Sequence, residues 1–180
     1  MTGVADGGPP DGATLRSVMS HFATGIVVVS TRWDDRHHAV TMNSLTSVSL
    51  DPPLVLVSVG SGSRFMHPLR RAGVWGVSIL PVTGGAVAAR LAARGVSGDD
   101  LLAAIPHRVG DTGVALLEES LATLECRTRD IHPAGDHELV IGDVVATSAP
   151  GSSAVAAPGG GATEAATPLV FYRGSYGTFA

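Results

Sequence analysis

Three short segments of the chain place hydroxyl, amide, glycine and arginine residues where they could bind a ligand. The first is a polar run in apolar surroundings, made of Thr41, Met42, Asn43 and Ser44 with Thr46 and Ser47. Hydroxyl and amide groups on a buried strand need hydrogen-bond partners, and a flat polar ligand could supply them. A strand whose polar side faces the solvent explains the same spacing, so the run alone leaves both interpretations open.

The second segment follows an apolar stretch that has the composition of a buried strand. It consists of Ser58, Val59, Gly60, Ser61, Gly62, Ser63 and Arg64. This composition is typical of a phosphate site, because glycines allow close approach of the backbone and an arginine makes a charge-assisted, bidentate contact. An ordinary turn has the same composition, so this segment also has two interpretations.

Histidines mark two further places. Gly135-Asp136-His137 predicts a turn that delivers a histidine to the start of a strand, although a lone histidine there is often structural. The neighbouring residues His37 and His38 would point to opposite sides of a strand, which does not favour a shared metal ion. We therefore predict an exposed turn at this pair and no metal site.

The charged residues exclude several classes of chemistry. All twelve basic residues are arginines, so a Schiff-base lysine, a P-loop lysine and a lysine general base are excluded. Any bound anion must be held by arginine, hydroxyl or backbone N–H groups. A net charge of -4 without a basic run argues against nucleic-acid binding. The single cysteine, Cys126, can form neither an internal disulfide nor a cysteine zinc site.

The length of 180 residues suits one compact domain. We expect a flexible tail over 1–11 and a single domain over 12–180. The stretch 148–167 consists almost wholly of small residues and prolines, and it cannot bury enough apolar area to offset its ordering entropy. It is predicted to be a flexible insertion. Neither a signal peptide nor a membrane span is expected, so a cytoplasmic location is predicted.

The elements that must position these segments follow from periodicity. Leu15, Val18, Met19 and Phe22 recur at helical spacing, which predicts an N-terminal helix with one apolar face. Shorter helices are expected over 64–71 and 86–94. Because the chain shows no regular βαβ alternation, a mostly antiparallel barrel is favoured over a doubly wound sheet. The expected strands are 26–31, 39–50, 54–59, 74–80, 121–127, 139–145 and 169–172.

The segments described above, together with others, occur in an order that is typical of a known protein family. The phrase T-x-N-S-x-T-S-V-S-L-D-P-P-L begins at Thr41, and it is accompanied by matching stretches at 15–19, 22–29, 63–64, 76–80, 135–137, 141–144 and 168–176. In this the chain resembles the short-chain flavin reductases of the FMN-binding split-barrel family. The resemblance covers 15–176 apart from the insertion.

The resemblance implies a fold and a cofactor site. The fold would be mostly β with short helices, a split β-barrel with antiparallel, Greek-key-like strands, assembled as a homodimer that binds FMN or FAD at the subunit interface. The isoalloxazine would lie against Thr41, Met42, Asn43 and Ser44, and the phosphate near Ser58–Arg64. Arg90 would reach the phosphate or ribityl end. His137 would lie beside the flavin, as a positioning residue where the nicotinamide is seated.

The implied activity is that of an NAD(P)H:flavin oxidoreductase, with NADH or NADPH as hydride donor, that supplies reduced flavin to a separate monooxygenase. Two other functions fit the same resemblance. One is an oxidoreductase that retains FMN and acts directly on an organic substrate or dioxygen. The other is a non-catalytic split-barrel protein that binds flavin or haem.

Overall fold

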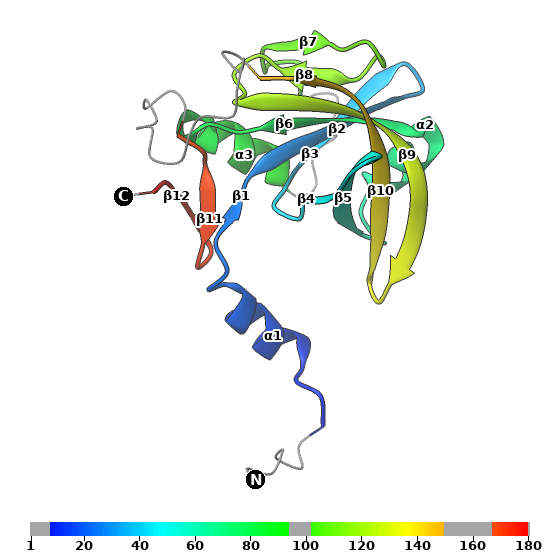
Figure 1. Ribbon diagram of the computed structural model, residues 1–180. Coiled ribbons are helices and arrows are strands. Elements are labelled where there is room, and N and C mark those ends of the chain that lie inside the picture. The colour runs from blue at the N-terminus through cyan, green and yellow to red at the C-terminus, as the bar shows by residue number, and fades with distance from the viewer. Residues whose placement is uncertain (1–7, 94–101, 150–166, 180) are drawn as a thin grey trace.

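The computed structural model describes residues 8–93, 102–149 and 167–179. Within these residues a body of antiparallel strands carries short helices, and α1 stands away from that body (Figure 1). The start of the predicted tail, 1–7, and most of the predicted insertion, 150–166, lie outside the described residues. The elements are α1 (Gly12–Met19), β1 (Thr24–Gly25), β2 (Val27–Trp33), β3 (Arg36–Met42), β4 (Thr46–Leu50), β5 (Pro53–Gly60), α2 (Met66–Ala72), β6 (Val74–Ile79), η1 (Val82–Gly84), α3 (Gly85–Ala92), β7 (His107–Val109), β8 (Ala115–Leu117), β9 (Ala122–Ala134), β10 (His137–Ser148), β11 (Val170–Tyr172) and β12 (Ser175–Gly177).

The main sheet has seven antiparallel strands in the order β3-β2-β6-β9-β10-β5-β4. In β5 the side chains of Val55, Val57 and Val59 are buried, and the residues between them are less so, which is the period of a half-buried strand. The edge strands β3 and β4 are consecutive in the sequence but are not hydrogen-bonded neighbours. The sheet is therefore open along one seam, and the prediction of a mostly β split barrel with short helices is confirmed.

The seam corrects one predicted element. The expected single strand over 39–50 is wrong, because the ladder of β3 ends at Met42 and that of β4 begins at Thr46. Between them Ser44 replaces ladder bonds with a side-chain bond: its Oγ donates to the carbonyl of Ser58 at 2.9 Å and accepts the Ser58 N–H at 3.1 Å. The sequence pattern does not show this break, because polar residues continue across it.

The structure also has longer and more numerous hairpins than the sequence predicts. The strands expected over 121–127 and 139–145 are parts of one long hairpin, β9–β10, whose turn contains Gly135 at a φ of 65°. The hairpin β7–β8 was not predicted. It is held by the buried carboxylate of Glu125, which accepts N–H bonds from Asp111 at 3.1 Å and Thr112 at 2.7 Å. Burial raises the pKa of Glu125, but these bonds outweigh it and lower the pKa overall.

The prediction of an exposed turn at His37 and His38 is wrong. Both residues lie within β3 and are half-buried. The ring of His37 makes an edge contact with His107 of β7, with 5.8 Å between the ring centroids. Alternation along the strand directs the two histidine side chains to opposite faces, as the sequence predicted.

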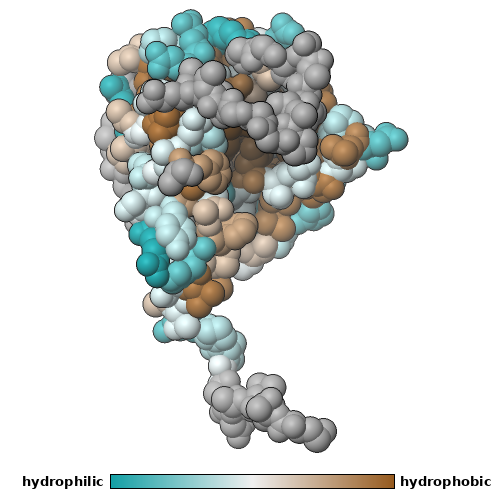
Figure 2. Space-filling view, turned by 60° about the vertical axis from the view of Figure 1, so that its left-hand side comes forward, coloured by the Kyte–Doolittle hydropathy of each residue, from teal (hydrophilic) through white to brown (hydrophobic). Residues whose placement is uncertain are grey.

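The three predicted helices are present, but the apolar face of α1 is not buried by the described residues. Asp11 caps α1 by accepting the N–H of Thr14 at 2.8 Å. Leu15, Val18 and Met19 nevertheless keep 56%, 64% and 52% of their surface exposed. Figure 2 shows hydrophobic side chains at the surface of this side of the molecule, around a hollow in the body. None of the described helices is long and apolar enough to span a membrane.

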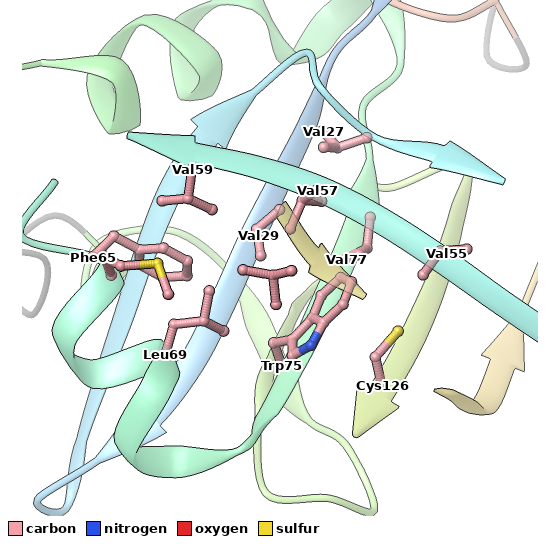
Figure 3. Close-up of a cluster of buried hydrophobic side chains, with 12 residues drawn as sticks. Val27, Val29, Val55, Val57, Val59, Phe65, Leu69, Trp75, Val77 and Cys126 are labelled. Carbon is pink, nitrogen blue, oxygen red and sulfur yellow. The ribbon is translucent and has the colours of Figure 1, made fainter. Parts of the chain in front are cut away.

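Two hydrophobic clusters lie on the two faces of the sheet. One packs β2, β5 and β6 against α2, and the other packs β2 and β3 against α3 and β7–β8. Figure 3 shows the first cluster, with the indole of Trp75 beside Cys126. Trp75 is fully buried, and it fits because the facing position on β10 is Gly142.

This contact generates a stability prediction. A methyl group at Gly142 would lie 2.5 Å from Cζ2 of Trp75 and 3.0 Å from Cβ of Cys126. We expect Gly142→Ala to lower the free energy of unfolding by about 1–3 kcal/mol, because a close-packed core cannot admit the extra carbon without strain. Urea unfolding measures the change.

Gly85→Ala is the matched control. No atom lies within 4 Å of the added methyl, and the residue begins α3 with helical dihedral angles. It should raise the free energy of unfolding by about 0.5–1 kcal/mol. Equal changes in the two variants would contradict the role given to Trp75.

Candidate functional site

A cavity of about 1170 Å³ lies where the sheet is open, and we call it the seam cavity. Its walls are α1, the segment 22–25, the seam residues 43–46, and Phe171, Arg173 and Gly174 around the β11–β12 turn. Val27 and Ile79 of the main sheet also line it. The cavity thus combines an apolar surface from the strands with polar groups from the seam and from α1.

Only part of the first predicted segment lies at the seam cavity. Asn43 and Ser44 line the seam cavity. The side chain of Thr41 packs toward α3, where its hydroxyl donates to the carbonyl of Ala88 at 2.8 Å. The side chain of Met42 packs against the cluster around Trp75. Neither Thr41 nor Met42 is among the residues that line the seam cavity.

The second predicted segment forms a tight turn that leads into α2. The N–H of Ser63 donates to the carbonyl of Gly60 at 2.8 Å, and the N–H of Ser61 donates to the carbonyl of Asp136 at 3.0 Å. Val59 is buried, so its side chain belongs to the core. Two backbone N–H groups of the turn are thus already in use, and its side chains add the hydroxyls of Ser61 and Ser63 and the guanidinium of Arg64 as groups that could donate to an anion.

The third predicted segment lies beside the second. Gly60 faces His137 in the β5–β10 ladder, and a Cβ on Gly60 would lie 3.9 Å from the Nε2 atom of His137. The other ring nitrogen, Nδ1, is 2.7 Å from the carboxylate of Asp136. A carboxylate only accepts, so Nδ1 carries the hydrogen. This bond lowers the pKa of Asp136, and Arg16 adds a smaller effect in the same direction.

Part of the predicted set forms a continuous strip, which consists of Ser44, Ser58, Gly60 and His137. Ser44 is bonded to Ser58, and Ser58 lies two positions along β5 from Gly60, about 7 Å at the rise of a strand. Arg90 lies apart from this strip, in the last turn of α3, two residues from the carbonyl that accepts from Thr41. The assignment of Arg90 to a phosphate stays a prediction.

Sequence reasoning missed two arginines that line the seam cavity. Arg16 lies on α1, and Arg173 lies in the β11–β12 turn. The dipeptide Arg173-Gly174 is typical of a turn, but the sequence does not show that this turn meets the segment after α1.

Two other places are less suited to a ligand or to catalysis. A smaller cavity of about 300 Å³ lies beside Glu125, but the Glu125 carboxylate is already bonded to the β7–β8 hairpin. Burial raises the pKa of Cys126 to about 12, which removes it as a nucleophile.

Comparison with known proteins decides the family. The family model for the flavin reductase like domain matches residues 19–180. The chain belongs to this family. The predicted resemblance is thereby confirmed.

Individual members of the flavin reductase like family can be aligned with nearly the whole chain. The NADH-dependent FMN reductase AsuE2 of Streptomyces nodosus subsp. asukaensis is 34% identical over 176 residues, which cover 96% of this chain and 87% of the relative. The reductase subunit HsaB of a flavin-dependent monooxygenase from Mycobacterium tuberculosis is 34% identical over 166 residues, covering 92% and 81%. The crystal structure of a nitrilotriacetate monooxygenase component B homologue from Mycobacterium thermoresistibile superposes with a TM-score of 0.81 at 32% identity, covering 93% and 86%.

The seam cavity of this family member has groups that fit a flavin. A flavin has a flat ring with polar edges and an anionic tail, so it needs an apolar surface, hydrogen-bond partners and a cation. Val27 and Ile79 supply the apolar surface, and Asn43 and Ser44 supply hydrogen-bonding groups. The arginines Arg16 and Arg173 are the cations in the lining. The hydroxyl of Thr24 is buried in the wall of the cavity and has no hydrogen-bond partner among the described residues. Such an orphaned group is costly unless a bound molecule satisfies it.

Proposed function

We propose that this protein is an NADH-dependent flavin reductase, which transfers a hydride from NADH to FMN and passes the reduced flavin to a separate monooxygenase. The observation that carries the proposal is the strip from Ser44 through Ser58 to His137, because it lies where the family resemblance puts the flavin. AsuE2, a relative of this chain, is an NADH-dependent FMN reductase, and HsaB is the reductase subunit of a monooxygenase. A cytoplasmic location belongs to the same proposal, since the hydride donor is an intracellular coenzyme.

In this proposal the protein positions the two reacting molecules and supplies no reactive group of its own. Bound FMN supplies a ring nitrogen that accepts the hydride. Asn43 and Ser44 would hold the polar edge of that ring, and the apolar side chains of Val27 and Ile79 would keep water from it. Transfer between two rings requires a separation of roughly 3–3.5 Å, which the walls of the cavity must maintain. No general acid or base is needed for this step.

The turn beside His137 would bind the phosphate of FMN. The Nδ1 atom of His137 is already engaged by the carboxylate of Asp136 at 2.7 Å, and the negative charge of that carboxylate disfavours a phosphate beside the ring. The hydroxyls of Ser61 and Ser63 and the guanidinium of Arg64 are donors. We therefore assign Arg64 to the phosphate and His137 to the positioning of the hydride donor.

The proposal includes a homodimer, for which the exposed apolar residues provide the support. α1 presents Leu15, Val18 and Met19 on a helix that stands away from its own body (Figure 1). Val48 and Leu50 of β4 are exposed at 49% and 89%, on the edge of the seam. A second copy of the chain would cover both surfaces, and it would close the open side of the seam cavity.

The activity itself is the first prediction of this proposal. The purified chain with FMN should oxidise NADH steadily, as followed by the loss of NADH absorbance, with slower turnover when FAD replaces FMN or NADPH replaces NADH. The absence of turnover with every combination would overturn the proposal. A protein that purifies yellow and turns over NADH poorly would instead be an oxidoreductase that retains its flavin.

The assignment of the phosphate gives a second prediction. Arg64→Ala should raise the dissociation constant for FMN about 10- to 100-fold, because a charge-assisted contact worth about 1.5–3 kcal/mol is lost. His137→Ala should leave FMN binding nearly unchanged and should raise KM for NADH. Flavin fluorescence titration measures the first effect and steady-state kinetics the second. Arg71→Ala, on the exposed end of α2, controls for net charge. Equal losses of FMN affinity in the Arg64 and His137 variants would contradict these roles.

The homodimer gives a third prediction. Val18→Asp should convert the protein to a monomer in sedimentation velocity at micromolar concentration, because a buried unpaired carboxylate opposes association. Val109→Asp is the control, since Val109 is 57% exposed on the distant β7–β8 hairpin. A monomeric parent protein, or a Val18 variant that remains dimeric, would contradict the proposed interface.

A further inference from the structure

Arg173 occupies an unusual backbone position. Arg173 has a φ of 50° and Gly174 a φ of 80°, so both central residues of the β11–β12 turn are left-handed. Turns of this kind favour glycine, asparagine and aspartate, because other side chains are strained there. The geometry of the turn therefore does not explain why position 173 holds an arginine.

The guanidinium of Arg173 is held by the segment that directly follows α1. Its Nη2 atom lies 2.7 Å from Nε2 of His21. Arginine only donates, so Nε2 accepts and the ring hydrogen is on Nδ1, which faces the carbonyl of Ser17 at 3.1 Å. The backbone N–H of Arg173 donates to the carbonyl of Ser20 at 2.9 Å. One edge of the guanidinium is thus fixed, and its remaining N–H groups are not used by this contact.

The surroundings of Arg173 lack a counter-charge. Arg173 and Arg16 line the seam cavity, and none of the described residues that line it is aspartate or glutamate. Within the described chain no carboxylate forms a salt bridge with Arg173. The unpartnered hydroxyl of Thr24 belongs to the same cavity. A fixed guanidinium in a cavity whose described lining contains no acid is an arrangement that an anionic molecule completes.

We infer that Arg173, positioned by His21, binds the diphosphate of NADH in the seam cavity. The inference rests on the proposed function, which needs two anionic molecules in one site. The turn before α2 serves the FMN phosphate from the β5–β10 side of the strip. Arg173 approaches from α1 and β11–β12, which is a separate position for a second anion. Its planar fork matches two phosphate oxygens, as a lysine does not.

Arg173→Asn tests the inference with stability as an internal check. Asparagine suits the left-handed turn better than arginine, so the melting temperature should stay the same or rise. KM for NADH should increase about 10- to 100-fold, while kcat at saturating NADH and the dissociation constant for FMN stay within about twofold. A merely structural Arg173 would lower the melting temperature and affect FMN and NADH alike.

Two further variants test the part played by His21. His21→Phe removes the acceptor for Arg173 and should raise KM for NADH in the same direction as Arg173→Asn, with FMN binding retained. His21→Gln restores an acceptor and should recover part of the loss. Arg71→Asn removes an exposed arginine on α2 and should leave every one of these constants unchanged.

Binding without turnover separates this inference from the proposed function. ADP-ribose carries the diphosphate but no nicotinamide, so its dissociation constant, measured by calorimetry, should rise about 10- to 100-fold in Arg173→Asn. If the parent protein turns over NADH but Arg173→Asn changes neither KM for NADH nor ADP-ribose binding, the inference is wrong and the proposed function stands. If the parent does not turn over NADH yet ADP-ribose binding depends on Arg173, the site stands and the proposed function fails. Weaker binding of FMN or FAD in the variant, with ADP-ribose unaffected, would assign Arg173 to the flavin and overturn the inference.

Discussion

The open seam between β3 and β4 is the constraint on which the rest of the structure depends. Edge strands carry backbone N–H and C=O groups that need partners, and most sheets hide them or close into a barrel. Here the chain crosses from one edge to the other through three residues, and the double hydrogen bond between Ser44 and Ser58 replaces the missing ladder. The seam leaves polar groups beside apolar strands, and this combination produces the cavity.

The absence of lysine shapes the chemistry of that cavity. An arginine keeps its charge at any physiological pH, and its guanidinium has a fixed geometry. Such a group is useful only where its direction is set by acceptors, and His21 sets it for Arg173 through a ring nitrogen. A neutral acceptor leaves the positive charge uncompensated, whereas a carboxylate in that place would cancel it. In the proposed role of Arg173, the histidine at 21 would orient the guanidinium without cancelling its charge.

Local pattern predicted much of the fold and part of the site. The apolar run of β5, the helical spacing in α1 and the glycine of the β9–β10 turn each follow from residues near one another in the sequence, although β5 alternates between buried and half-buried residues instead of being buried throughout. The seam did not, because Ser44 depends on Ser58, which lies on another strand. The β7–β8 hairpin likewise depends on Glu125 from β9. Burial of a carboxylate and replacement of ladder bonds are tertiary effects that periodicity does not record.

The two arginines of the cavity wall were missed for the same reason. Arg16 and Arg173 are far apart in the sequence, and only the contacts of α1 with the β11–β12 turn bring them to one cavity. α1 carries the apolar residues on which the proposed homodimer rests, and the segment directly after α1 carries the histidine that contacts Arg173. In the proposed homodimer, a second copy that packs on the exposed face of α1 would also order the Arg173 end of the cavity, whereas the turn at Gly60 depends on strands within one chain.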